Sequence, residues 1–126
     1  MKILLIDDDK WIRDSLTLFF EAEGCLLVAC ETAEEALEAL KGVTPDVIIA
    51  DYRLPGVDGL ELLRRVGPSH PRAIKILVTA YRSDDVVSEA ASLGIDAFIE
   101  KPLTAKGIEE SLSGLIGERQ RMGQRP

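Results

Sequence analysis

Acidic, hydroxyl and basic side chains follow short apolar runs at four places in the chain. Three adjacent aspartates, residues 7–9, follow the run ILLI, and Asp51 follows VIIA. Thr79 follows ILV, and Lys101 stands two residues after AFI. If each apolar run is a buried parallel strand, the polar side chains lie beyond the carboxyl ends of the strands, where ligands bind in open α/β sheets. The pattern therefore predicts one polar site at that rim.

These side-chain types indicate a site for a divalent cation and a phosphoryl group. Adjacent carboxylates repel one another, which raises their pKa values unless a cation relieves the repulsion. A set of oxygen ligands without cysteine or histidine favours a hard ion, Mg²⁺ or Mn²⁺, over Zn²⁺. Magnesium binds one or two carboxylates together with phosphoryl oxygens. The hydroxyl of Thr79 and the ammonium group of Lys101 suit the remaining charge of a phosphoryl group.

Asp51 is the natural candidate for the acceptor of that phosphoryl group. A carboxylate can act as a nucleophile and form an aspartyl phosphate. Asp51 stands alone at its strand end, between the acid cluster and Thr79 in the sequence. Each of these residue types also has an ordinary structural role, since aspartate often caps helices. We expect Asp9, which is nearest to the next helical pattern, to be such a cap, whereas the joint placement of the others indicates a function.

Length and composition fit one globular domain. A chain of 126 residues can bury a single core, and its 46% apolar and 29% charged residues are ordinary values. No apolar run approaches the roughly 20 residues that span a bilayer, and MKILLIDDDK has no signal-peptide cleavage site, so no membrane association is expected. Cys25 and Cys30 match no metal or redox spacing, which favours reduced thiols in a cytoplasmic protein.

The charge distribution separates the body of the chain from its end. The formal net charge is −7, but residues 118–126, ERQRMGQRP, hold three arginines against one glutamate. We expect residues 1–117 to form the domain and residues 118–126 to form a short, disordered basic tail. Because the body is acidic, we expect no direct binding of nucleic acid by this domain.

Five apolar runs alternate with helix-length amphipathic segments, which predicts an α/β fold. The expected strands are Lys2–Ile6, Cys25–Cys30, Asp46–Ala50, Ile74–Val78 and Ala97–Ile99. Several are apolar on both faces, as in central parallel strands. Repeated βα units with short connections form right-handed crossovers. The expected fold is a flavodoxin-like (βα)5 three-layer sandwich, with a five-stranded parallel sheet in the order 2-1-3-4-5.

The helical segments differ in how much apolar surface they offer to the core. Thr32 begins a capping box with Glu35, which predicts the start of the second helix. The fourth helix, which starts near Ser83, offers only Val86, Val87, Ala90 and Ala91. Because most of these side chains are small, we expect the fourth helix to be the least firmly held.

Four motifs, LLIDDD, VIIADYRLPGVDGLEL, ILVTA and AFIEKP, stand in this order along the chain. In these motifs and their spacing, residues 1 to about 117 resemble the chemotaxis-regulator-like receiver domains of two-component response regulators. The resemblance implies a phosphorylation-activated signalling switch rather than a metabolic enzyme. Asp51 would accept the phosphoryl group of a phosphohistidine on a histidine kinase or histidine phosphotransfer protein. The domain would catalyse this acceptance itself and lose the group slowly to water.

The resemblance also implies the metal ligands of the site. Asp7 and Asp8 would hold Mg²⁺, or Mn²⁺, together with Asp51 and the backbone carbonyl of Arg53.

Further residues are implied to bind the phosphoryl oxygens. Thr79 would donate its hydroxyl, the backbone of Ala80 would bind a second oxygen, and Lys101 would pair with a third. In this family the bond from Lys101 to Pro102 is typically cis, which would direct the ammonium group inward.

Switching is implied to follow from the same contacts. Thr79 would move toward the phosphorylated acceptor, and the aromatic side chain on the fifth strand, Phe98, would turn into the space that opens. Phe98 has no hydroxyl, so packing has to distinguish its two orientations. The affected surface would consist of the fourth helix, the fifth strand and the fifth helix, and it would bind an output domain, another protein or a second copy.

Arg53 and Tyr81 occupy the positions that modulate dephosphorylation in the family.

Two other functions are weighed against this one. IDDDKW resembles the start of the haloacid dehalogenase phosphatases, in which Asp7 would be the nucleophile and Asp9 the acid and base. Thr79, Lys101 and the pair Asp84–Asp85 would then have supporting roles. Trp11 stands where that family has threonine or valine, and Asp51 would have no role. The second alternative is a phosphorylation-independent interaction module, which normally lacks one of the site residues.

Overall fold

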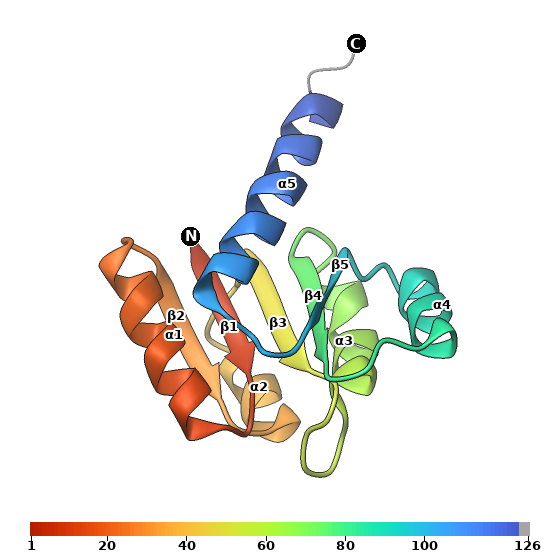
Figure 1. The fold of residues 1–126 in the computed structure, drawn as a ribbon, viewed down its shortest axis with the longest axis horizontal. Helices are drawn as coiled ribbons and strands as arrows, with labels where there is room; N and C mark the ends of the chain where they lie inside the picture. Colours follow the sequence, from red (N-terminus) through yellow and green to blue (C-terminus); the bar gives the residue numbers. More distant parts are fainter. Residues whose placement is uncertain (124–126) are drawn as a thin grey trace.

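Five parallel strands form the centre of the fold, in the order β2-β1-β3-β4-β5 (Figure 1). The computed structural model describes residues 1–123, and the side chains of residues 1–118. The strands are β1 (Lys2–Ile6), β2 (Leu26–Cys30), β3 (Val47–Asp51), β4 (Ile74–Thr79) and β5 (Ala97–Glu100). The predicted α/β fold and strand order are confirmed. The predicted strand bounds differ from these by at most one residue at either end.

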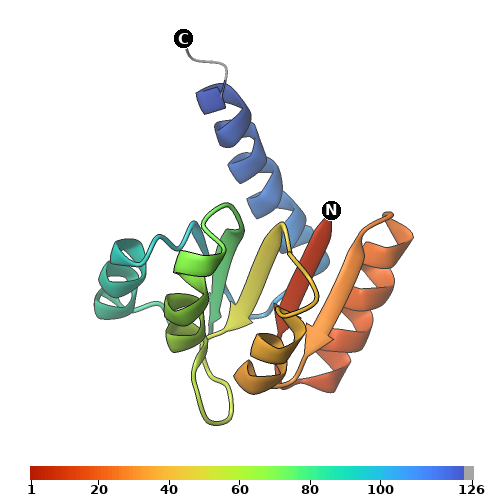
Figure 2. The same ribbon diagram turned by 180° about the vertical axis from the view of Figure 1, so that it is seen from behind.

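The helices divide between the two faces of the sheet (Figures 1 and 2). They are α1 (Lys10–Ala22), α2 (Ala33–Ala39), α3 (Gly59–Val66), α4 (Asp84–Ser92) and α5 (Ala105–Gly123). A short 3-10 helix, η1 (Gly67–Ser69), follows α3. Leu16 of α1 and Ile108 of α5 pack with Ile49 on one face. On the other face, Leu63 of α3 packs with Ile48. The result is the predicted three-layer sandwich.

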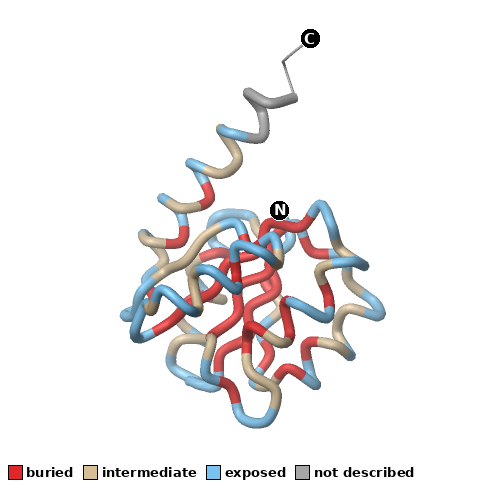
Figure 3. Tube along the Cα trace, turned by 90° about the vertical axis from the view of Figure 1, so that its right-hand side faces the viewer, coloured by how far each residue is buried: buried red, intermediate tan, exposed pale blue. Residues whose placement is uncertain are grey.

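The central strands are buried along their whole length (Figure 3). All residues of β3 and β4 are buried, because helices cover both sides of the sheet. Burial of this apolar surface is the main stabilising contribution to the fold, at roughly 25 cal/mol per Å². The strand β5 is only partly buried and lies at the edge of the sheet.

Side-chain caps define where the helices begin. Asp9 caps α1, accepting hydrogen bonds from the backbone N–H groups of Trp11 and Ile12, so the predicted capping role of Asp9 is confirmed. Thr32 caps α2 through the N–H of Glu35, as its capping box predicts. Ser83 caps α4 in the same manner, through the N–H of Val86.

The helix α4 buries few side chains in the core. It stands at the β5 edge of the molecule (Figure 1). Ala90 is its buried residue, while Val86 and Val87 are half-buried. The expectation that Ala91 also faces the core is wrong, because Ala91 is exposed. A helix with so small a buried surface has a low free energy of local unfolding.

The end of α5 differs from the expected tail. The helix continues to Gly123, instead of giving way to a disordered segment at residue 118. The residues of this stretch, ERQRM, have high intrinsic helix propensity, which favours the extension. The remaining residues of the expected tail, 124–126, lie outside the described residues. Among residues 1–123, none of the helices is long and apolar enough to cross a lipid bilayer.

Candidate functional site

The predicted site residues meet at the carboxyl edge of the sheet. Asp7 follows the last residue of β1, and Asp51 is the last residue of β3. The strands β1 and β3 are hydrogen-bonded neighbours with Ile6 paired to Ala50, so the residues that follow this pair are the two aspartates. Thr79 ends β4, the other neighbour of β3. The topology therefore brings side chains from distant parts of the sequence to one place.

Three carboxylates form a cluster that can hold a cation. One oxygen each of Asp7, Asp8 and Asp51 lie within 4.8 Å of one another. Asp7 and Asp51 are 2% and 1% exposed, whereas Asp8 faces solvent. Burial raises the pKa of Asp7 above its ordinary value of 3.8, and the charges of Asp51 and Asp8 raise it further. The N–H of Asp9 donates to Asp7 Oδ1 at 2.8 Å and opposes this shift.

Lys101 forms an ion pair with the buried carboxylate of Asp51. Its Nζ lies 2.7 Å from Asp51 Oδ2. Burial lowers the pKa of Lys101, but the hydrogen bond to Asp51 and the charges of the acid cluster outweigh it, so that the pKa is raised. The second oxygen of Asp51, Oδ1, accepts a hydrogen bond of 3.1 Å from the N–H of Arg53. The peptide bond between Lys101 and Pro102 is cis, as predicted.

The hydroxyl of Thr79 is bound to the loop that follows β4. Thr79 Oγ1 donates to the carbonyl of Tyr81 at 2.8 Å and accepts from the N–H of Tyr81 at 3.2 Å. Thr79 is 5% exposed, whereas Tyr81 is 79% exposed. The predicted switch residue Phe98 is half-buried on β5 and packs against the core cluster that includes Leu63 of α3 and Ala90 of α4.

Two residues that shape the site were not predicted. Arg13 on α1 donates from Nη1 to the carbonyl of Asp7 at 2.9 Å and so fixes the end of β1. Gly59 begins α3 against the acceptor strand, where an added Cβ would overlap the backbone carbonyl of Asp51 and lie 3.2 Å from Tyr52 Cα. The sequence signal for Gly59 is its position directly after the cap residue Asp58 in the turn LPGVDG, but sequence alone does not show the close approach to Asp51.

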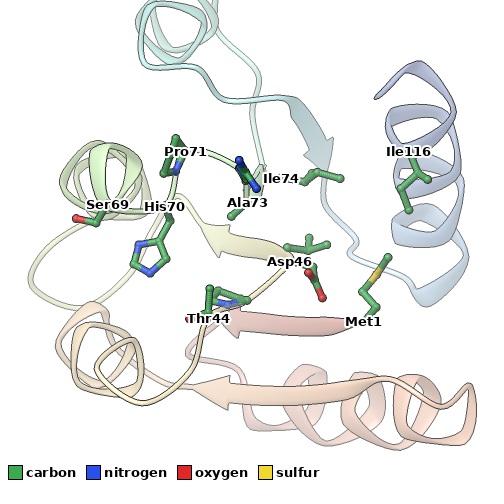
Figure 4. Close-up of a pocket in the computed structure, with 12 residues that line it drawn as sticks. Met1, Thr44, Asp46, Ser69, His70, Pro71, Ala73, Ile74 and Ile116 are labelled. Carbon is green, nitrogen blue, oxygen red and sulfur yellow. The ribbon is translucent and has the colours of Figure 1, made fainter. Parts of the chain in front are cut away.

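A hollow larger than the one beside the acid cluster lies elsewhere. It has a volume of about 890 Å³ and is lined by residues such as Met1, Asp46, Ala73 and Ile116, at the opposite end of the sheet (Figure 4). Asp46 and Arg72 are the acidic and basic side chains of its lining, next to apolar residues such as Ala73, Ile74 and Ile116. A smaller hollow of about 400 Å³ borders the acid cluster, and Asp7, Ile12 and Lys101 are among its lining residues. Size alone therefore does not mark the chemical site.

The strand order and the acidic site at the carboxyl edge of the sheet are those of a receiver domain, and comparison with known families agrees. The family model for the response regulator receiver domain matches residues 3–113. The chain belongs to the response regulator receiver family. A receiver-domain protein (CheY-like) of Methanospirillum hungatei JF-1 has the same fold, with a TM-score of 0.87 and 30% identity, over 96% of this chain and 97% of that one.

Two further comparisons extend this result. The transcriptional regulator NtrC of Escherichia coli is 36% identical over 100 residues, which are 79% of this chain and 21% of NtrC. The chain spans between about a fifth and a half of the length of the curated relatives that it matches. A response regulator of Burkholderia pseudomallei, with a phosphorylated aspartic acid, a calcium ion and citrate, has a TM-score of 0.82 at 22% identity, over 98% of this chain and 75% of that chain.

The phosphatase alternative is not favoured. That alternative needs Asp9 as an acid and base, but the Asp9 carboxylate caps α1 through two backbone N–H groups. Asp84 and Asp85 are exposed in the first turn of α4. The buried, ion-paired carboxylate at the centre of the site is Asp51, which has no role in the phosphatase scheme.

Proposed function

We propose that Asp51 accepts a phosphoryl group from a phosphohistidine of a histidine kinase or a histidine phosphotransfer protein. The observation that carries this proposal is the environment of Asp51. Its carboxylate is buried, clustered with Asp7 and Asp8, and ion-paired with Lys101. Burial and flanking charges of both signs are the features of a carboxylate that is positioned for phosphoryl transfer. The Burkholderia pseudomallei regulator with a phosphorylated aspartic acid supports the same chemistry in this fold.

We further propose Mg²⁺, or Mn²⁺, as the cofactor of this reaction. The donor set fits the ion, because three carboxylate oxygens lie within 4.8 Å of one another. Burial and, to a smaller extent, the charges of Asp51 and Asp8 raise the pKa of Asp7, and a bound cation would offset the cost of ionising it. Asp7, Asp8, Asp51 and the carbonyl of Arg53 would hold the ion. When bound, it would neutralise part of the charge on the phosphoryl oxygens.

The protein's own groups prepare and stabilise the transfer. An oxygen of Asp51 attacks the phosphorus while the bond from phosphorus to the histidine nitrogen breaks. Lys101 Nζ, which pairs with Asp51 Oδ2 at 2.7 Å, can pass to a phosphoryl oxygen. Thr79 can turn its hydroxyl from the Tyr81 carbonyl to a second oxygen, and the backbone N–H of Ala80 can donate to a third. The domain thus catalyses its own phosphorylation and its slow dephosphorylation.

The output surface in this proposal is formed by α4, β5 and α5. Thr79 and Phe98 connect it to the site, and the small buried surface of α4 makes it the element that moves most easily. The partner would be an output domain, another protein or a second copy of the chain, and residues 1–117 would form the receiver domain.

Because the histidine kinases of two-component systems phosphorylate their regulators in the cytoplasm, we propose a cytoplasmic location.

Mass spectrometry tests the acceptor directly. The protein is incubated with Mg²⁺ and a small phosphodonor such as acetyl phosphate, and the mass of one phosphoryl group is expected on the wild type. Asp51→Asn and chelation of Mg²⁺ should both abolish this gain. Asp9→Asn is the matched control, because asparagine also caps helices and uptake should continue. Uptake by Asp51→Asn at the rate of the wild type would contradict the proposal. Hydrolysis of a generic phosphatase substrate that is lost in Asp7→Asn but kept in Asp51→Asn would favour the phosphatase alternative.

A further inference from the structure

Arg82 contacts the ring that the proposed switch has to move. The Arg82 guanidinium carbon lies 5.2 Å from the centre of the Phe98 ring. A cation over an aromatic face within about 6 Å is attracted by the quadrupole of the ring. Phe98 is half-buried on β5, and Arg82 is exposed. The guanidinium group of an exposed residue therefore lies over the ring of a half-buried one.

The loop that carries Arg82 is also bound to Thr79. The Thr79 hydroxyl donates to the carbonyl of Tyr81 and accepts from its N–H, and Arg82 is the next residue. A threonine hydroxyl has a single hydrogen to donate. When that hydrogen is donated to a phosphoryl oxygen on Asp51, the bond to the Tyr81 carbonyl is lost. The same event that moves Thr79 therefore loosens the backbone that positions Arg82.

Phe98 needs an external contact to hold one orientation. Because its side chain has neither donor nor acceptor, a hydrogen bond cannot distinguish an outward from an inward ring. Its contact with Arg82 can do so, because a cation–π interaction depends on the position of the cation over the ring face. A ring that turned toward Thr79 would move away from the exposed guanidinium group and lose this attraction.

We propose that Arg82 is a positioning residue that holds Phe98 in its resting orientation and couples the release of Phe98 to Thr79. This inference rests on the proposed phosphorylation of Asp51. In the resting state, the Thr79–Tyr81 hydrogen bonds fix the loop, and Arg82 lies over Phe98. After phosphorylation the loop is freed, and Phe98 can turn inward. Without the guanidinium group, the resting equilibrium shifts toward the released ring, because one of the two states has lost a stabilising contact.

The orientation of Phe98 can be measured by NMR on the full chain. The chain contains three phenylalanines, which are labelled with ¹³C in their rings, and the Phe98 resonance is assigned by its loss in Phe98→Leu. Spectra are recorded with Mg²⁺ before and after the addition of beryllium fluoride, which mimics a phosphoryl group on aspartate. Arg82→Met removes the charge and keeps the length of the side chain. Arg65→Met is the control, because it removes an exposed arginine charge on α3.

In the wild type, we expect the mimic to shift the Phe98 resonance. In Arg82→Met, the resonance should lie partway toward that position before the mimic is added, which corresponds to an increase of about two- to five-fold in the ratio of released to held ring. Arg82→Lys, which keeps a cation, should give a smaller displacement, and Arg65→Met should give none. A Phe98 resonance in Arg82→Met at the resting wild-type position, or displaced only as much as in Arg65→Met, would overturn the proposal.

Phosphoryl uptake by the same samples separates this inference from the proposed function. If Asp51 takes up a phosphoryl group in every variant while the Phe98 resonance is unmoved in Arg82→Met, the role of Arg82 alone is refuted. If the wild type takes up none, the proposed function fails, and with it the coupling that we assign to Arg82.

Discussion

Lys101 Nζ lies 2.7 Å from Asp51 Oδ2, so the proposed acceptor is ion-paired before any phosphoryl group arrives. The two partners differ in environment, since the Asp51 side chain is 1% exposed and that of Lys101 is 38% exposed. Lys101 can therefore leave the carboxylate for a phosphoryl oxygen without leaving a buried charge of its own. Asp51, by contrast, depends on its partner, because Asp7 and Asp8 add two further negative charges close by.

Lys101→Met is expected to destabilise the protein at pH 7 in the absence of divalent cations. The substitution leaves Asp51 buried beside two acids without a cation, and the loss of a hydrogen bond to a charged group costs about 1–3 kcal/mol. Urea denaturation measures the effect, and added Mg²⁺ should recover part of it. Lys106→Met changes another exposed lysine close in sequence and should have little effect. Equal stability of the two variants would contradict the importance of the ion pair.

Asp7→Asn is expected to stabilise the protein at neutral pH when no metal is present. The pKa of Asp7 is raised in the folded state by burial and by Asp51, so the folded state binds a proton more tightly than the unfolded state. Folding therefore favours the protonated form of Asp7, and the free energy of unfolding of the wild type decreases as the pH rises through the raised pKa of Asp7. The variant's gain in stability over the wild type should vanish below pH 3.8, the ordinary pKa of aspartate, because Asp7 is then protonated in both the folded and the unfolded state.

Thermal unfolding of Asp7→Asn and the wild type between pH 3 and pH 8 measures this effect. Mg²⁺ should reverse the order at neutral pH, because the wild type retains one more ligand and gains more from binding the ion. A variant that is less stable than the wild type at neutral pH without metal would show that the burial of ionised Asp7 is not costly.

Gly59→Ala is expected to destabilise the fold and to reduce phosphoryl uptake. A Cβ at this position would overlap the carbonyl of Asp51, so either α3 or the end of β3 has to shift, and overpacking of this kind costs about 1–3 kcal/mol. Urea denaturation and the rate of uptake on Asp51 measure the two effects. Gly114→Ala is the matched control, because that Cβ would meet no atom within 4 Å and alanine favours a helix by about 0.5–1 kcal/mol.

The double variant Arg53→Ala, Tyr81→Ala is expected to lose its phosphoryl group faster than the wild type. Both side chains are exposed, and the backbone of each contacts a site residue, Asp51 and Thr79 respectively. They can therefore screen the acceptor from an attacking water. Loss of about 1 kcal/mol of protection would speed hydrolysis roughly five-fold. The measurement is the decay of the phosphorylated mass after removal of the phosphodonor, and slower decay in the double variant would contradict the role proposed for both residues.

Much of this protein could be predicted from local sequence signals. The apolar run KILLI predicts β1 with its observed bounds, and Asp9 is an N-cap because a short acceptor side chain precedes an amphipathic helix. The weak packing of α4 was evident from its small side chains. The prediction that Ala91 faces the core was wrong, because the spacing of apolar residues does not show how much of a helix at the edge of the sheet is covered by neighbouring elements.

The sequence by itself determined the strands, their parallel order, and which side chains stand at the carboxyl ends, because burial of apolar runs and right-handed crossovers leave few alternatives. Only the tertiary structure decided the contacts between distant residues. Packing and register set the approach of Gly59 to Asp51 and the position of Arg82 over Phe98. The hydrogen bonds that bind Thr79 to Tyr81 likewise depend on the path of the loop after β4. Distances of a few ångströms between such groups follow from the assembled sheet and loops, whereas sequence periodicity fixes only the face on which a residue lies.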